Sequence, residues 1–205
     1  MELSSKPAAD YRGFFADGRS AVTLLQDFRT VSWQNVRRVF QLLNDIAREG
    51  EVVNYAIGGA IAAVFYVEPF ATQDIDVFVM MKTDASGLVT TIPGLDYLKA
   101  HGYTAMRGEA IVVEDWPVQF IPVSNALEEE AFLNAATLDF EGVPVRVVLA
   151  EHLVAIMLRT ARLKDLARVE MFLSQSAVDQ SLLLDIVRRH NLEKQWAEFQ
   201  NRGLQ

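Results

Sequence analysis

The chain has 205 residues, of which 51% are hydrophobic and 22% charged, so it can bury a core of about one domain and is not mainly disordered. It has no cysteine, which excludes disulfide scaffolds, cysteine-ligated zinc, iron–sulfur clusters and thiol nucleophiles, and favours a reducing cytoplasm. The longest uncharged stretch, residues 52–67, covers 16 residues. A spanning helix needs about 20 apolar residues, so no membrane segment is expected.

The net charge of −8 is unevenly distributed. Residues 150–205 hold eight basic and seven acidic side chains (+1), which leaves eleven basic and twenty acidic ones (−9) in residues 1–149. Residues 1–31 show no hydrophobic period and are expected to form an arm or loop. Strand and helix patterns fill residues 32–149, and only helix patterns follow in 150–205. This order predicts an α+β core followed by a small C-terminal helical bundle.

The elements of the core follow from hydrophobic spacing and from turn residues. Helices are predicted at residues 32–48, 60–67 and 126–136, with a broken one at 86–101. Strands are predicted at 52–57, 74–81, 103–107, 111–115, 118–123 and 143–149, with a turn at Trp116-Pro117. Glu128 is expected to complete a capping box with Asn125 at the start of the third helix. Three further helices are predicted around 153–157, 166–173 and 182–187.

One segment carries chemistry: Gly58-Gly59 at a strand-to-helix turn, followed by Asp74-Ile75-Asp76 in the next strand. Two glycines let a phosphate approach the backbone closely, and the first turn of a helix presents free N–H groups to it. Residues two apart in a strand share a face, so both carboxylates project together. Neighbouring carboxylates repel each other unless a cation lies between them, and Mg²⁺ (or Mn²⁺) with phosphate oxygens suits such a pair.

The ordered motifs resemble the nucleotidyltransferase superfamily of DNA polymerase beta. Gly58-Gly59, then Asp74-Ile75-Asp76, then Arg162-Leu163-Lys164-Asp165 are similar to segments of its small bacterial members, of the AbiEii-toxin type and the minimal nucleotidyltransferases, over residues 50–175. The resemblance implies a mixed β-sheet flanked by helices, an NTP substrate, and Asp74 and Asp76 as catalytic metal ligands. Nucleotide-binding residues would be Gly58, Gly59, Thr72, Gln119, Arg162 and Lys164.

The sequence departs from that family at its third carboxylate. Gln119 stands where an acid is expected, and an amide is a poor general base. Glu114 and Asp115 could replace the acid if their hairpin lies close to the site. A second departure is Met157, at a position where related helices often carry a lysine.

Other interpretations of these residues stay open. Thr72 can equally stabilise a turn, and Arg162 and Lys164 can belong to a surface network in which Asp165 pairs with Arg168. The first hypothesis is an enzyme that transfers a nucleoside monophosphate from an NTP to an acceptor hydroxyl on a protein, an RNA or a small molecule. The second is a binding module for a nucleotide or protein partner, without catalysis, in a toxin–antitoxin-like context. Apolar tail helices also permit a homodimer.

Overall fold

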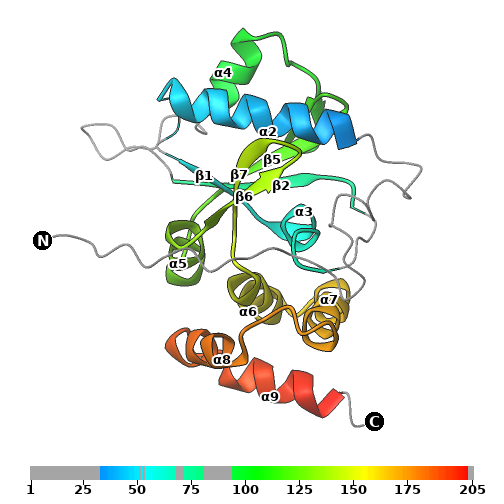
Figure 1. The fold of residues 1–205 in the computed structure, drawn as a ribbon, viewed down its shortest axis with the longest axis vertical. Coiled ribbons are helices and arrows are strands. Elements are labelled where there is room, and N and C mark those ends of the chain that lie inside the picture. Colours follow the sequence, from blue (N-terminus) through cyan, green and yellow to red (C-terminus); the bar gives the residue numbers. More distant parts are fainter. Residues whose placement is uncertain (1–32, 51, 53, 68–71, 81–93, 203–205) are drawn as a thin grey trace, which may run out of the picture.

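The computed structural model describes residues 33–50, 52, 54–67, 72–80 and 94–202 (Figure 1). The predicted arm at 1–31 and the first half of the broken helix at 86–101 lie outside these residues. The described chain contains a seven-stranded sheet in the order β3-β4-β5-β2-β1-β7-β6. The strands are β1 (Tyr55–Ile57), β2 (Ile75–Val79), β3 (Met106–Arg107), β4 (Ala110–Val113), β5 (Trp116–Pro122), β6 (Ala136–Phe140) and β7 (Val143–Val147).

The sheet is mixed, and helices flank it. β2 pairs parallel with β5, and β1 pairs parallel with β7, whereas β1–β2, β3–β4, β4–β5 and β6–β7 are antiparallel. The helices are α2 (Trp33–Arg48), α3 (Gly59–Ala63), α4 (Leu95–Ala100), α5 (Ala126–Leu133), α6 (Ala150–Thr160), α7 (Leu163–Ser174), α8 (Gln180–Arg189) and α9 (Glu193–Arg202). The predicted α+β class, with a mixed sheet and a C-terminal set of helices, is therefore confirmed.

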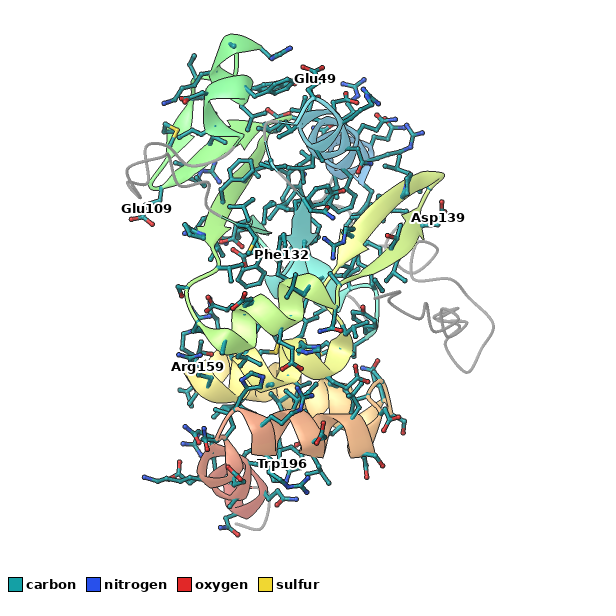
Figure 2. The ribbon with its side chains drawn as sticks, turned by 90° about the vertical axis from the view of Figure 1, so that its left-hand side faces the viewer. Glu49, Glu109, Phe132, Asp139, Arg159 and Trp196 are labelled. Atoms are coloured by element: carbon teal, nitrogen blue, oxygen red, sulfur yellow. The ribbon has the colours of Figure 1, made fainter. Side chains whose placement is uncertain are left out.

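The helices lie on both sides of the sheet. α2 covers one side, while α3 and α5 lie on the other, and α6 to α9 extend the molecule beyond them (Figures 1 and 2). α2 buries one apolar stripe against the sheet, made of Val36, Val39, Phe40, Leu43 and Ile46. α6 contacts α3, α5, α7, α8 and α9, so it joins the sheet to the last helices. None of the described helices is long and apolar enough to cross a membrane.

Several elements differ from the sequence prediction. The hairpin turn lies at Glu114-Asp115, and Trp116-Pro117 instead begins β5. Both turn residues have positive φ (50° and 68°), as in the two-residue hairpin turns that match strand twist. The helix predicted at 126–136 ends at Leu133, and the unpredicted β6 pairs with β7. The unpredicted α9 follows α8, its half-buried Trp196 and Phe199 stacked on each other.

A charged cluster joins α5 to the C-terminal helices. The Glu130 carboxylate contacts His152 Nε2 at 3.1 Å, His190 Nε2 at 2.7 Å and Arg189 Nη1 at 2.6 Å. Burial raises the pKa of Glu130, but the hydrogen bonds from Arg189, His190 and His152 outweigh it and lower that pKa from 4.5 to about 2. The ionised carboxylate therefore stabilises the contact between α5, α6 and α8.

Replacing Glu130 with Gln tests this cluster. A lowered pKa contributes stability above the unfolded value near 4.5, and that stability is lost as pH falls towards 2. Glu130→Gln is expected to lower the free energy of unfolding by about 2–3 kcal/mol at pH 7, and by progressively less below pH 4. Urea denaturation at several pH values measures it. Glu129→Gln, an exposed change on the same helix, is the control; equal effects of the two variants would contradict the assignment.

Candidate active site

Gly59 brings the turn after β1 against the Asp76 side chain. Its φ is +56°, and a Cβ built on it would lie 1.9 Å from Asp76 Oδ2. Any larger residue would therefore be strained in its backbone and would also collide with this carboxylate. The Asp76 carboxylate consequently lies directly against the main chain at the start of α3.

Gly58 has a different local role. A Cβ there would lie 2.4 Å from Phe78 Cε2, so the absent side chain makes room for the Phe78 ring. Its N–H already donates to the Asp76 carbonyl oxygen at 2.9 Å. Gly58 therefore joins the α3 turn to β2, and this backbone N–H is not available to a phosphate.

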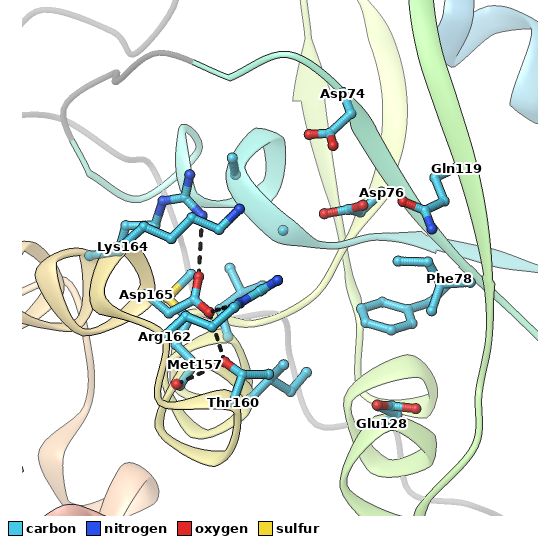
Figure 3. A pocket seen from close by; sticks show the side chains of 16 residues that line it. Asp74, Asp76, Phe78, Gln119, Glu128, Met157, Thr160, Arg162, Lys164 and Asp165 are labelled. Atoms are coloured by element: carbon cyan, nitrogen blue, oxygen red, sulfur yellow. Dashed lines mark hydrogen bonds and ion pairs between the residues drawn. The ribbon is translucent and has the colours of Figure 1, made fainter. Parts of the chain in front are cut away.

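Most of the predicted site residues converge on one cavity of about 330 Å³ between the sheet and the helices α6 and α7 (Figure 3). Asp74 and Asp76 lie on the sheet side, opposite Arg162 and Lys164 on the α7 side. Six of the eight predicted residues line it: Gly59, Asp74, Asp76, Gln119, Arg162 and Lys164. Gly58 and Thr72 are not among the lining residues, and the Thr72 hydroxyl donates to the Asp74 carbonyl oxygen at 3.2 Å, as in the turn interpretation.

The Asp76 carboxylate is electrostatically unfavourable where it lies. Burial and, to a smaller extent, the negative charge of Asp74 raise its pKa from 3.8 to about 6, against the opposing effect of Arg162, Lys164 and Arg168. A divalent cation between the two carboxylates would relieve both causes. Mg²⁺ commonly binds through one or two carboxylates together with substrate phosphates and water, so this pair fits it in donor type and number.

A buried carboxylate positions the cations on the other wall. Asp165 is 2% exposed and accepts hydrogen bonds from Thr160 Oγ1 at 2.8 Å, Arg162 Nε at 2.6 Å and Arg168 Nη1 at 3.5 Å. Asp165 thus forms the ion pair with Arg168 that the sequence suggested as an alternative. Arg162 and Arg168 nevertheless line the cavity as well. Lys164 forms no ion pair with any described residue, so its charge is available to an anion.

The position of the third carboxylate is occupied by an amide. Gln119 pairs with Asp76 across β5 and β2. Glu114 does not replace it, because it is bound to Arg38 at 3.1 Å and to Tyr103 at 2.9 Å. Asp115 accepts from Asn35 of α2 at 3.2 Å, on the opposite side of the sheet from α3. Within the described ranges, no three His, Asp or Glu side chains gather where they could hold a metal.

The cavity also has an apolar part, which the sequence did not reveal. It is lined by Phe78, Ile121, Leu153, Ile156 and Met157. Glu128 lines the same cavity, and Phe78 lies between it and Asp76 (Figure 3). The sequence indicated only a capping role for Glu128, and no local pattern shows that the first turn of α5 faces β2.

A second cavity of about 240 Å³ adjoins the first. It shares Asp74 and Gln119 with the first cavity. Its other lining residues are Gln73, Arg107, Glu109, Ala110 and Pro117. Two cavities that share Asp74 and Gln119 offer separate places for two reactants beside the same carboxylate.

The pKa of Asp76 predicts a pH-dependent effect of Asp76→Asn. A raised carboxyl pKa means that the folded protein loses stability as pH rises from about 4 to about 6. The amide has no charge to bury, so without divalent metal the variant should be more stable than the wild type by about 2–3 kcal/mol at pH 7.5 and about equal at pH 3.5.

Urea denaturation in EDTA at both pH values measures this difference. Adding Mg²⁺ should then stabilise the wild type and not the variant. Equal stability at pH 7.5 in EDTA would contradict the charge repulsion described above.

No family model matches the chain, and no curated protein sequence matches it significantly. Among solved structures, it is similar to an antigenic nucleotidyltransferase-like protein from Paracoccidioides brasiliensis, with 16% identity, a TM-score of 0.50, and 80% of this chain and 90% of that one covered. It also matches ANT(2")-Ia in complex with adenylyl-2"-tobramycin, with 15% identity, a TM-score of 0.42, and coverages of 80% and 97%. A third match is the Megavirus polyadenylate synthase, with 14% identity, a TM-score of 0.38, and coverages of 78% and 35%.

The first of these matches shows a shared fold. The chain therefore has a nucleotidyltransferase-like fold, as its motifs predicted. The narrower resemblance to the AbiEii-toxin type stays a prediction.

Proposed function

We propose that this protein transfers a nucleoside monophosphate from an NTP to an acceptor hydroxyl, with Mg²⁺ (or Mn²⁺) held by Asp74 and Asp76. The observation that carries the proposal is the cavity itself. It places two neighbouring carboxylates opposite Arg162 and Lys164. A metal triphosphate has both kinds of partner, since its cation binds carboxylates and its oxygens bind cationic side chains.

The cations would hold the β- and γ-phosphates. Lys164 has no ion pair among the described residues, and the 2.6 Å contact with Asp165 fixes Arg162. A guanidinium already oriented loses less freedom when it binds an anion. Gly59 lets the Asp76 carboxylate lie against the main chain at the start of α3, which fixes the position of one of the two acids that would hold the metal.

The proposed transfer can be written without a third carboxylate as the proton acceptor. The acceptor oxygen bonds to the α-phosphorus, the bond from that phosphorus to the bridging oxygen breaks, and pyrophosphate leaves. The acceptor proton passes to water, because the Gln119 amide does not take up a proton at neutral pH. Bound metal would supply charge neutralisation at the reacting phosphate. Asp74, which lines both cavities, lies where the two substrates would meet.

The second cavity favours a small hydroxylated acceptor. Its lining is mainly polar, with side chains of both charges from Arg107 and Glu109, and contains no aromatic residue. Amide, carboxylate and guanidinium groups supply donors and acceptors for hydroxyl groups. Unpaired RNA ends are commonly held by stacking on aromatic side chains, and the net charge of −8 opposes binding of a polyanion.

A second candidate is a nucleotide-binding module that does not catalyse transfer. Gln119 in place of an acid favours it, together with the absence of a three-carboxylate group among the described residues. Such a module would bind an NTP through Lys164 and Arg162 and release it unchanged.

Incubation with Mg²⁺ and α-³²P-labelled NTPs tests transfer, with a pool of small hydroxylated acceptors and release of pyrophosphate as the readout. Asp74→Asn and Asp76→Asn should each lower the rate at least about 100-fold, because the metal then loses a ligand. Glu129→Gln, on an exposed helix face, is the matched control and should keep the rate. Equal rates in all variants would show that Asp74 and Asp76 do not hold a catalytic metal.

Gln119→Asp separates the two candidates. For an enzyme limited by its missing base, the new carboxylate should raise the rate by about tenfold or more, since a positioned general base contributes about 10²–10⁴-fold. Gln119→Asn, of the same length as Asp, controls for the change in shape and should give no gain. Nucleotide binding with no pyrophosphate release by either the wild type or Gln119→Asp would favour the binding module.

A further inference from the structure

The first cavity, which would hold the NTP, has a charged end and an end with a different lining. Asp74, Asp76 and the α7 cations lie at one end, and Glu128 lies at the other beyond the Phe78 ring (Figure 3). A triphosphate held by the α7 cations would direct its nucleoside towards Phe78 and Glu128. The aliphatic and aromatic wall between the two ends suits a flat base, because aromatic faces stack on bases with little dependence on sequence.

The Glu128 carboxylate is held in place on one side only. Its Oε2 accepts hydrogen bonds from the Ser124 N–H at 2.9 Å and from the Ser124 hydroxyl at 2.8 Å. Its own N–H donates to Asn125 Oδ1 at 3.2 Å. No described residue donates to Oε1. The carboxylate therefore has a fixed orientation and retains acceptor capacity at Oε1.

A fixed carboxylate beside an apolar wall is suited to recognising a donor on a base edge. Exocyclic amino groups of adenine, cytosine and guanine donate hydrogen bonds, whereas uracil presents a carbonyl oxygen where cytosine has its amino group. A carbonyl oxygen would repel the carboxylate and leave it without a partner. The same contact that favours an amino group therefore disfavours uracil.

From this geometry we infer that Glu128 is a specificity residue that selects NTPs whose base carries an exocyclic amino group, with UTP rejected. The inference rests on the proposed function, since it requires an NTP in this cavity. A hydrogen bond to a charged group contributes about 1.5–3 kcal/mol, which corresponds to a preference of about 10- to 150-fold for ATP over UTP.

The Glu128 side chain accepts from Ser124, the residue before the N-cap Asn125, and not from the Asn125 N–H that a capping box requires. It still holds the chain that enters α5, so its variants must separate this structural role from recognition. In Glu128→Gln the amide oxygen can still accept from Ser124, while the NH₂ group faces the cavity in place of Oε1. Because both contacts with Ser124 can be kept, helix α5 should keep its stability. Asn125→Ala does the opposite, because it removes the side-chain cap of α5 and leaves the Glu128 carboxylate.

Calorimetric titration of the full chain with ATP and UTP, in Mg²⁺, tests the inference. The wild type should bind ATP at least about tenfold more tightly than UTP. Glu128→Gln should weaken ATP and strengthen UTP, so that the ATP-to-UTP affinity ratio falls about tenfold or more, with little change in thermal midpoint. Asn125→Ala should lower the midpoint and keep the ratio.

Two results would overturn the inference, and they differ in what else fails. If the wild type binds both nucleotides and Glu128→Gln leaves their affinity ratio unchanged, Glu128 has this structural role alone and the proposed function stands. If the wild type binds neither nucleotide in Mg²⁺, the proposed function fails and this inference fails with it.

Discussion

The site depends on a carboxylate held against a turn that has no room for a side chain. Asp76 Oδ2 occupies the space that a Cβ on Gly59 would fill, and burial beside Asp74 raises the pKa of Asp76 to about 6. This arrangement costs the folded protein stability at neutral pH, and an opposite charge beside the two acids would lower that cost. A divalent cation shared by the two acids is the partner that best matches their chemistry.

Charge is distributed over the cavity in a way that matches a metal nucleotide. Acids on the sheet face Arg162 and Lys164 on α7, and Asp165 orients Arg162 from below the surface. The apolar wall and Glu128 extend the same cavity beyond the charged part. The second cavity meets the first at Asp74 and Gln119, so in the proposed transfer the NTP and the acceptor would lie on either side of these two residues.

The motifs allowed the fold and most of the charged lining to be predicted from the sequence. Gly59, Asp74 and Asp76 are close in the chain, and the spacing of two acids in a strand predicts that their side chains share a face. Arg162 and Lys164 were predicted from the resemblance to nucleotidyltransferases. Glu128, Phe78 and the Arg107–Glu109 turn were not foreseen, because their place in a cavity depends on how β5, α5 and the β3–β4 hairpin pack. The hairpin turn was misplaced because a Trp-Pro pair reads as a turn, whereas Glu114 and Asp115 adopt the positive φ angles.

The most direct test of the shared cation is a crystal structure with Mn²⁺ and an α,β-methylene NTP analogue, which does not allow transfer to proceed. Mn²⁺ scatters anomalously, so its position does not depend on the fitted coordinates. The account predicts an anomalous peak within about 2.5 Å of carboxylate oxygens of both Asp74 and Asp76, with phosphate oxygens completing the ligands and lying towards Lys164. A fully occupied analogue with no peak between these two acids, or a peak elsewhere, would contradict it.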